Sequence, residues 1–338
     1  MTHEFKKIIN SYTDTQKKGN RCVLATVVAL EGSSYRRPGV RMLIDELGNM
    51  TGAVSGGCVE KEVLRQSESV FSDGIAKIVT YDGRYRLGCE GILYILVEPF
   101  SLAADSIKVI FGEIKSRKPF MITTFFSTEI NNVAMGSVIK LKNGEIIPLS
   151  NRFSTENAVS RKQFSQKMEP CFKLMIVGAE HDAVQLCAAT SLLGWEVTVI
   201  SSPKDPKTLL NFPGAEEVLH VLPEEFSSDG IDGETAVILM NHNYVTDLKF
   251  LISLKDSRPA YIGLLGPAKR REKLLHEFME YVTEPDDAFL EGIHGPAGLN
   301  LGAETPQEIA VYILSEILAV LRNQEPFPLK EKRDRIHN

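Results

Sequence analysis

The feature that most constrains the fold is the stretch FKLMIVGAEHDAVQLCAATSLLGWEVTVIS at residues 172–201. It reads as an apolar strand, a glycine turn, a helical segment and a second apolar strand. Strands joined through a helix run parallel in one sheet, so this stretch predicts the start of a Rossmann-like, doubly wound parallel-sheet domain. The segments AVILMNH (236–242) and PAYIGLLG (259–266) and a closing helix from Pro306 continue the alternation.

The first half of the chain has a different pattern, with many short strands and few helices. The segment CVLATVVAL (22–30) is apolar and β-branched, and later apolar runs have the same character. A chain of 338 residues also exceeds one ordinary core, which favours two domains. We therefore predict an α/β protein in two parts. Its predicted division is an N-terminal mixed α/β domain at 1–150, a linker at 151–170, a Rossmann-like domain at 171–328 and a charged tail at 329–338.

Composition excludes several functional classes. A net charge of -6 argues against nucleic-acid binding, which needs clustered lysine and arginine. No apolar run approaches the roughly 20 residues that cross a bilayer, so no membrane span is expected. Five cysteines without a CxxC pair suit the reducing cytoplasm, and the seven histidines show no zinc-site spacing, so no metal site is expected.

The glycine turn of the second half departs from the dinucleotide fingerprint G-x-G-x-x-G/A. Gly178 holds the first position, but Glu180 brings bulk and negative charge to the middle position, where backbone normally approaches a pyrophosphate. Ser201 stands where an acidic residue normally binds the ribose. The sequence therefore argues against NAD(P). An NAD(P)-dependent oxidoreductase with His242 or His294 as acid–base remains the alternative function.

Ligands in open α/β sheets bind at the carboxyl ends of the strands. Loops expected at that edge supply the candidate cofactor-binding residues of the second half, with His242 and His294 on loops at the same edge. These candidates are Gly178, His181, His242, Gly266 and His294.

Three loops of the first half combine hydroxyl groups, guanidinium groups and bare backbone, at residues 31–39, 52–60 and 88–91. This combination suits a phosphate or another polyanion. The residues predicted to bind it are Ser33, Ser34, Arg36, Arg37, Gly56 and Gly57. Cys58 starts a predicted helix, where the dipole lowers a thiol pKa, and Cys89 lies in a glycine loop. Glu60 is expected to interact with the first turn of that helix rather than to act as a base.

The motifs LATVVALEGSSYRRPGVRML, TGAVSGGCVE, GCEGILYILVEP and GLNLGAETPQEIA, in this order, resemble those of the XdhC/CoxI family. The resemblance covers nearly the whole chain. It implies a cytoplasmic accessory factor that binds molybdenum cofactor as cargo and assists its sulfuration and insertion into a xanthine dehydrogenase-type molybdenum hydroxylase. A cofactor chaperone fits this resemblance better than a turnover enzyme.

The resemblance also implies partners and roles for the cysteines. The partners are the apo-hydroxylase and a cysteine desulfurase, and a homodimer is the general expectation. Cys89 or Cys58 would lie near the molybdenum, which accepts soft sulfur ligands. Tyr35, Glu90 and Glu180 depart from the family pattern. A third hypothesis is an interaction scaffold for hydroxylase assembly that binds no small molecule.

Overall fold

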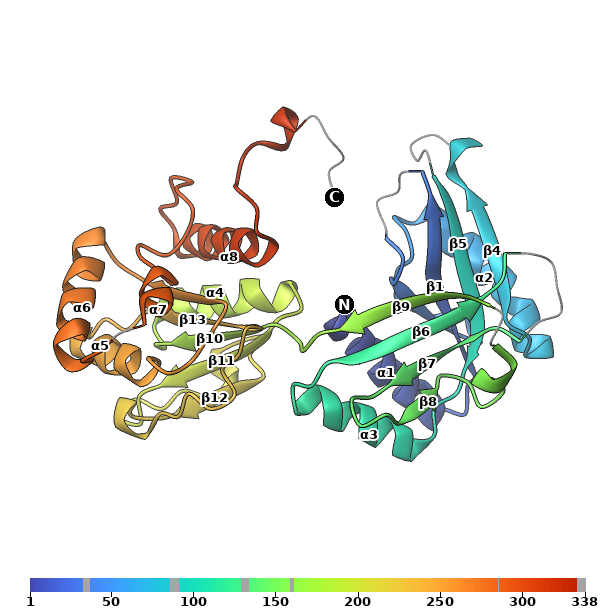
Figure 1. Cartoon of the computed structure of the whole chain (residues 1–338), viewed down its shortest axis with the longest axis horizontal. Coiled ribbons are helices and arrows are strands. Elements are labelled where there is room, and N and C mark those ends of the chain that lie inside the picture. The colour runs from blue at the N-terminus through green and yellow to red at the C-terminus, as the bar shows by residue number, and fades with distance from the viewer. Residues whose placement is uncertain (33–36, 86–90, 129–133, 159–160, 285, 333–338) are drawn as a thin grey trace. The chain divides into compact units, whose positions relative to one another are not determined.

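The computed structural model describes residues 1–32, 37–85, 91–128, 134–158, 161–284 and 286–332. The chain divides into two compact units, Met1–Cys171 and Phe172–Asn338 (Figure 1). The first unit is mixed α/β with antiparallel sheets, and the second is built on one parallel sheet. The predicted fold class is therefore confirmed.

The first unit contains two antiparallel sheets and three helices. Sheet A has the strand order β3-β2-β1-β5-β4, and sheet B has the order β8-β7-β6-β9. Sheet A consists of β1 (Cys22–Glu31), β2 (Arg41–Asp45), β3 (Met50–Gly52), β4 (Lys77–Asp82) and β5 (Ile92–Phe100). Sheet B consists of β6 (Phe120–Phe126), β7 (Gly136–Lys140), β8 (Ile146–Pro148) and β9 (Lys162–Met168). The helices are α1 (Thr2–Lys17), α2 (Cys58–Asp73) and α3 (Ala104–Lys115).

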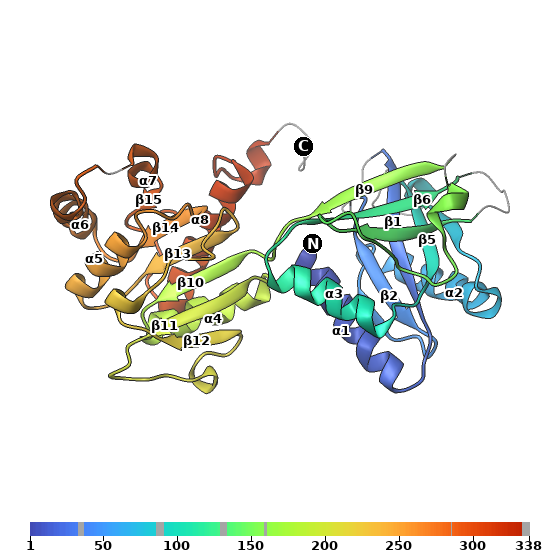
Figure 2. The ribbon, with the colours of Figure 1, turned by 60° about the horizontal axis from the view of Figure 1, so that its bottom comes forward.

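Helix spacing of apolar residues explains how this unit packs. In α1, Phe5, Ile8, Ile9 and Tyr12 fall on one face and are buried. They share a core with α3 and with inward-facing residues of both sheets, and Figure 2 shows α1 and α3 beneath the strands of this unit. Helix α2 covers the other face of sheet A, where its buried valines contact apolar residues of β1 and β2.

The predicted linker at 151–170 is wrong for residues 162–168, because they form β9 and complete sheet B. The short 3-10 helix η2 (Thr155–Ala158) is followed by β9, which pairs antiparallel with β6 from Phe120↔Met168 to Phe126↔Lys162. Strand β9 lies at the edge of sheet B and most of its side chains are exposed or half-buried. An edge strand of this kind needs few apolar residues, so its composition resembles that of a linker.

The second unit is a six-stranded parallel sheet, sheet C, in the order β12-β11-β10-β13-β14-β15. In chain order within the unit this is 3-2-1-4-5-6, the Rossmann arrangement. The strands are β10 (Lys173–Val177), β11 (Glu196–Ser201), β12 (Glu217–His220), β13 (Thr235–Leu239), β14 (Tyr261–Leu264) and β15 (Ile293–His294). The helices are α4 (His181–Leu192), α5 (Tyr244–Ser253), α6 (Ala268–Tyr281), α7 (Asp287–Glu291) and α8 (Pro306–Arg322).

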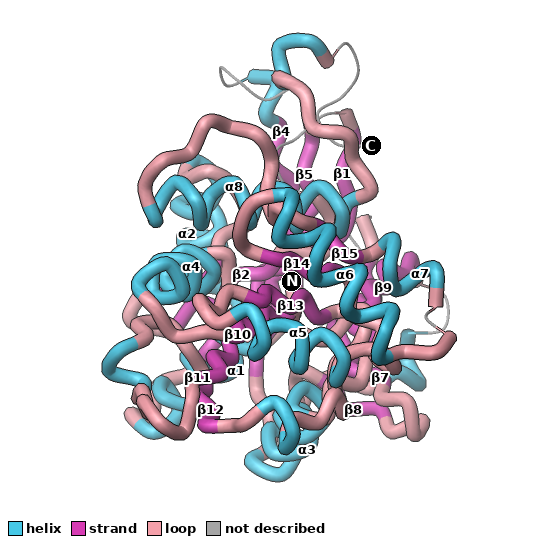
Figure 3. Tube along the Cα trace, turned by 90° about the vertical axis from the view of Figure 1, so that its left-hand side faces the viewer, coloured by secondary structure: helices cyan, strands magenta, loops and turns pink. Residues whose placement is uncertain are grey.

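Helices cover both faces of sheet C, as a doubly wound fold requires. Buried residues of α4 and α8 form one core with the sheet, and those of α5, α6 and α7 form the other (Figure 3). Helix α8 begins with the predicted capping box, in which the Thr305 hydroxyl accepts from the Glu308 N–H. Among the described residues, no helix combines the length and the apolarity needed to cross a membrane.

Candidate functional site

Strand register brings the strand ends that flank the three motif segments of the first unit to one end of sheet A. Glu31, at the end of β1, pairs with Ile92 at the start of β5, and Asp82 at the end of β4 pairs with the same residue. The chain entering β2 runs beside Val27, and β3 ends beside Met42. Strands β1, β3 and β4 therefore finish at the same end of sheet A, where β5 begins. We call this region the motif end of sheet A.

Several predicted site residues fall outside the described part of the chain. These are Ser33, Ser34, Arg36 and Cys89. Arg37 is described and exposed, and Cys58 is the first residue of α2. The geometry of the motif end is therefore carried by Arg37, the Gly56–Gly57 turn and the strand ends around them.

The turn before α2 is organised by the Glu60 carboxylate. Gly57 is the N-cap at φ 123°, a backbone angle that favours glycine. Glu60 Oε1 accepts from the Ser55 N–H at 2.6 Å, and Oε2 accepts from the Ser55 hydroxyl at 2.6 Å and from the Gly57 N–H at 2.9 Å. The prediction that Glu60 serves the first turn of the helix is confirmed. The expectation of bare N–H groups is wrong for Gly57, because this capping box already supplies an acceptor.

The electrostatics of this turn follow from the same contacts. Burial pushes the pKa of Glu60 upward, but hydrogen bonds from Ser55 and from backbone N–H groups outweigh it and lower the pKa overall. The carboxylate is thus held ionised against the helix start. Within the described residues, a Cβ placed on Gly56 or Gly57 would meet no atom within 4 Å, so the described chain leaves the backbone beside this carboxylate open.

The chain that leads into β2, at Gly39 and Arg41, is held by contacts with sheet B. Gly39 has φ 101°, and a Cβ there would lie 2.4 Å from Gln166 Nε2. Arg41 Nη1 donates to the Gly39 carbonyl at 2.9 Å and to Gln166 Oε1 at 2.5 Å. Gln166 belongs to β9, the strand that sequence interpretation assigned to a linker. This clamp was therefore invisible in the sequence.

A buried polar network lies between the two sheets beside this clamp. Glu98 of β5 accepts from the Ser137 N–H at 2.8 Å and from its hydroxyl at 2.5 Å, and that hydroxyl also lies 2.9 Å from the Thr124 hydroxyl. Burial raises the pKa of Glu98 from 4.5 to about 7, against the opposing effect of Ser137 and Arg41. Among the described residues, Arg41 Nε and Nη2 and Thr26 Oγ1 are buried without a hydrogen-bond partner.

The second unit has the strand order of a Rossmann switch point, because β10 pairs with both β11 and β13. Gly178 follows β10 at φ 129°, and a Cβ there would lie 2.8 Å from the Met240 carbonyl oxygen. The glycine is thus required by close packing of this turn on the chain after β13. Glu180 is the N-cap of α4 and is exposed, and His181 begins the helix and is also exposed.

The end of β11 does not present a ribose-binding group. Ser201 is 2% exposed, and its hydroxyl lies 2.8 Å from His220 Nδ1 in the neighbouring strand. Two positions normally recognise a dinucleotide: the middle glycine of the turn and an acidic residue at the end of the second strand. Here they are the exposed Glu180 and the buried Ser201.

The basic start of α6 is largely engaged within the protein. Arg270 Nη2 donates to Asp247 Oδ2 at 2.7 Å and to the Asn241 carbonyl at 3.0 Å. Asp247 is 1% exposed, so this is a buried ion pair that secures the turn after β13. Gly266 has φ 120°, and a Cβ there would lie 2.7 Å from Arg270 Cδ. The glycine therefore makes room for this arginine, while His242 on the same turn is exposed.

The prediction that His294 lies on a loop is wrong. His294 is the last residue of β15 and pairs with Gly263. Its ring stacks on Tyr261 with centroids 4.4 Å apart, and its Nδ1 lies 3.2 Å from Glu316 Oε1 of α8. Glu316 Oε2 accepts from the Tyr261 hydroxyl at 2.5 Å and from the Gly298 N–H at 2.7 Å. Burial raises the pKa of Glu316, but these hydrogen bonds lower it overall.

The cluster of His294, Tyr261 and Glu316 ties β14, β15 and α8 together. His242 instead lies beyond the end of β13, so the two histidines occupy different levels of sheet C. In the described part of the chain, no group of three or more histidine, cysteine and acidic side chains is placed to hold a metal ion. Cys22, Cys171 and Cys187 are buried, as expected of structural cysteines.

Both halves of the chain match models of known protein families. Residues 15–82 match the model of the XdhC and CoxI family, and residues 174–317 match that of the XdhC Rossmann domain. A probable xanthine dehydrogenase subunit from Bacillus subtilis is 27% identical, covering 93% of this chain and 96% of its own. The molybdenum cofactor insertion chaperone PaoD from Escherichia coli is 22% identical, covering 96% of this chain and 91% of its own.

A solved structure has the same fold. The crystal structure of a protein described as a xanthine dehydrogenase from Bacillus halodurans superposes with a TM-score of 0.77 and 24% identity. The match covers 96% of this chain and 98% of that one. The two matched domains and their order, with the full-length Bacillus subtilis relative, show that the chain belongs to the XdhC and CoxI family.

Proposed function

We propose that this protein binds molybdenum cofactor, assists its sulfuration and delivers it to a xanthine dehydrogenase-type molybdenum hydroxylase. The observation that carries the proposal is that the strand ends flanking the three motif segments meet at the motif end of sheet A. The proposal is also supported by the similarity of the chain, over nearly its full length, to an insertion chaperone for this cofactor.

The motif end offers groups suited to a phosphorylated pterin. Arg37 is exposed there, and Arg36, Ser33 and Ser34 precede it in sequence. A guanidinium fork matches phosphate oxygens, and the open backbone at Gly56 admits a close approach. Glu60 beside it requires the anionic end of the cargo to lie toward the arginines, with a hydrogen-bond donor of the cargo toward the carboxylate.

The cysteines would supply the sulfur chemistry. Cys58 is the first residue of α2, and Cys89 lies in the sequence between β4 and β5. A cysteine desulfurase would be the sulfur source. The homodimer and the cytoplasmic location stay predictions, and the oligomeric state is checked by light scattering of the purified chain.

The test is transfer of cofactor to a purified apo-hydroxylase by the wild-type chain and by Arg37→Ala. We expect Arg37→Ala to retain less molybdopterin and to activate less hydroxylase. Arg65→Ala is the matched control, because Arg65 lies on α2 and pairs with Glu62 of the same helix. Equal transfer by Arg37→Ala and wild type would contradict the proposed role of the motif end.

Cysteine variants separate carriage from sulfuration. If Cys89→Ser and Cys58→Ser retain cofactor but deliver it without cyanide-releasable sulfur, the sulfuration role is supported. If both variants deliver fully sulfurated cofactor, the protein is an insertion chaperone and sulfuration occurs elsewhere.

The Rossmann strand order keeps one alternative in view, an NAD(P)-dependent oxidoreductase. Glu180 at the start of α4 and the buried Ser201 both argue against it. Titration with NADH and NADPH, followed by nucleotide fluorescence, decides the question, and we expect no tight binding of either.

A further inference from the structure

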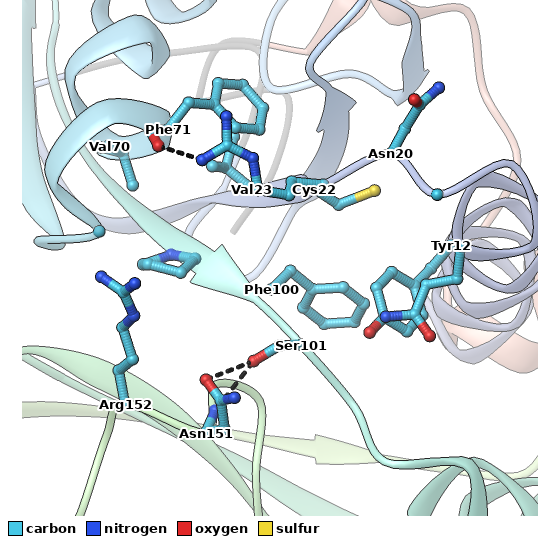
Figure 4. Close-up of a pocket in the computed structure, with 15 residues that line it drawn as sticks. Tyr12, Asn20, Cys22, Val23, Val70, Phe71, Phe100, Ser101, Asn151 and Arg152 are labelled. Carbon is cyan, nitrogen blue, oxygen red and sulfur yellow. Dashed lines mark hydrogen bonds between the residues drawn. The ribbon is translucent and has the colours of Figure 1, made fainter.

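A cleft of about 440 Å³ opens at the end of sheet A opposite the motif end (Figure 4). It lies where β1 begins and β5 ends, since Cys22 pairs with Phe100 there. The last turns of α1 and α2 and the segment after β8 complete its walls. Its volume is in the range of small-molecule sites. None of the candidate site residues predicted from the sequence is among the residues that line it.

Two arginines supply the charge of this cleft. Arg21 and Arg152 are the charged residues among the described residues that line it, and no carboxylate lines it with them. Arg21 pairs with Glu46, which lies outside the lining. For Arg152, no carboxylate of the described chain lies within ion-pair distance. The cleft therefore has a net positive lining.

Both arginines are positioned by the C-terminal end of α2. Arg21 Nη1 donates to the Phe71 carbonyl at 2.6 Å, and Arg152 Nη1 donates to the Asp73 carbonyl at 3.1 Å. Gly74, the C-cap, makes room for Arg152, because a Cβ there would lie 1.5 Å from Nη1. Cations favour helix C-termini, so these contacts stabilise the helix. They use one guanidinium nitrogen of Arg152, which leaves further N–H donors for an anion.

The remaining lining is apolar at depth and polar at its rim. Val23 and Val70 are buried, and Phe100 meets the Tyr12 ring edge-on with centroids 4.9 Å apart. Figure 4 shows Ser101 and Asn151 hydrogen-bonded to each other on the wall that also carries Arg152. Such a wall suits a flat apolar body whose charged end faces the arginine.

The cysteine in this cleft is not suited to act as a nucleophile. Cys22 lines it, but this residue is 5% exposed. Burial raises the pKa of Cys22 to about 11, with a further contribution from Asp45. A thiol with so little thiolate at neutral pH is a poor nucleophile.

We propose that this cleft binds a small organic anion, a flat apolar body that carries a phosphate or carboxylate group. The site is separate from the motif end and does not depend on the proposed function. The charged group contacts Arg152, and the apolar body rests against the half-buried Phe71 and Pro99.

The test is calorimetric titration of the full chain with phenyl phosphate, benzoate, inorganic phosphate and phenol. We expect phenyl phosphate or benzoate to bind more tightly than inorganic phosphate and phenol, since only these combine both features. Arg152→Gln should weaken this binding by about tenfold, the loss of a charge-assisted contact. Preference between phenyl phosphate and benzoate identifies the anionic group.

Two further variants distinguish a specific loss of binding from unfolding of the protein. Gln16→Trp places a bulky ring at the cleft rim from an exposed position of α1 and should abolish binding while circular dichroism stays unchanged. Arg65→Gln, outside the cleft, should bind as wild type does. No binding of phenyl phosphate or benzoate at about 10 mM would overturn the proposal. So would equal binding of inorganic phosphate, or unchanged binding by both Arg152→Gln and Gln16→Trp.

Discussion

Replacing the buried Glu98 by glutamine should remove most of the pH dependence of stability of the first unit. Glu98 accepts both of its protein hydrogen bonds from Ser137 in the facing sheet. Its pKa is raised from 4.5 to about 7, mainly by burial. The folded state therefore binds the proton more tightly than the unfolded state does. The contribution of protonated Glu98 to the free energy of unfolding is therefore complete below pH 4.5 and is lost as the pH rises through 7.

The size of this effect follows from the difference between the folded and unfolded pKa values. A pKa difference of one corresponds to about 1.36 kcal/mol, so the first unit of the wild-type protein should lose about 2 to 3 kcal/mol between pH 5 and pH 8. Glutamine keeps an acceptor for the Ser137 N–H and has no ionisation in this range. Glu98→Gln should therefore gain stability relative to wild type as the pH rises.

The assay is hydrogen exchange of the Ser137 amide and of β5 at pH 5, 6, 7 and 8, corrected for intrinsic exchange rates. The chain contains its own control, since Trp195, its one tryptophan, lies in the second unit against Phe172. Urea unfolding followed by tryptophan fluorescence should be the same in wild type and Glu98→Gln at every pH. Equal pH dependence of exchange in both proteins would refute the reasoning.

Two further predictions concern the caps and clusters around the candidate sites. Glu60→Ala removes the acceptor of three hydrogen bonds and should destabilise the start of α2 by about 1 to 2 kcal/mol, seen as faster amide exchange at residues 55–59. Glu62→Ala on the same helix should change exchange there little. Glu316→Gln should weaken the cluster with Tyr261 and His294 and lower the free energy of unfolding of the second unit by about 1 to 3 kcal/mol, seen as a lower urea midpoint of tryptophan fluorescence. An unchanged midpoint would show that the cluster does not stabilise the second unit.

Much of the second unit was predictable because its signals are local. The run 172–201 alternates strand and helix with unbroken apolar strands, and the residues at both ends of each element mark its limits. The cap at Thr305 and Glu308 was readable for the same reason, since the contacting groups lie within one turn.

The parts that sequence missed depend on contacts between distant segments. Strand β9 is an edge strand with few apolar residues, and only its pairing with β6 identifies it. The clamp of Arg41 with Gln166 and the pair of Glu98 with Ser137 join residues of different sheets. The same holds for the cleft between Arg21 and Arg152, because no pattern along the chain shows that both reach the end of α2.

The central claim is tested most directly by measuring what the full chain carries. The protein is purified from a host that makes molybdenum cofactor, and the released small molecules are identified by mass spectrometry and counted against protein. The account predicts molybdopterin in a defined ratio to the chain, reduced in Arg37→Ala and unchanged in Arg65→Ala. Protein that carries no molybdopterin from such a host, and takes up none when mixed with the free cofactor, would contradict it.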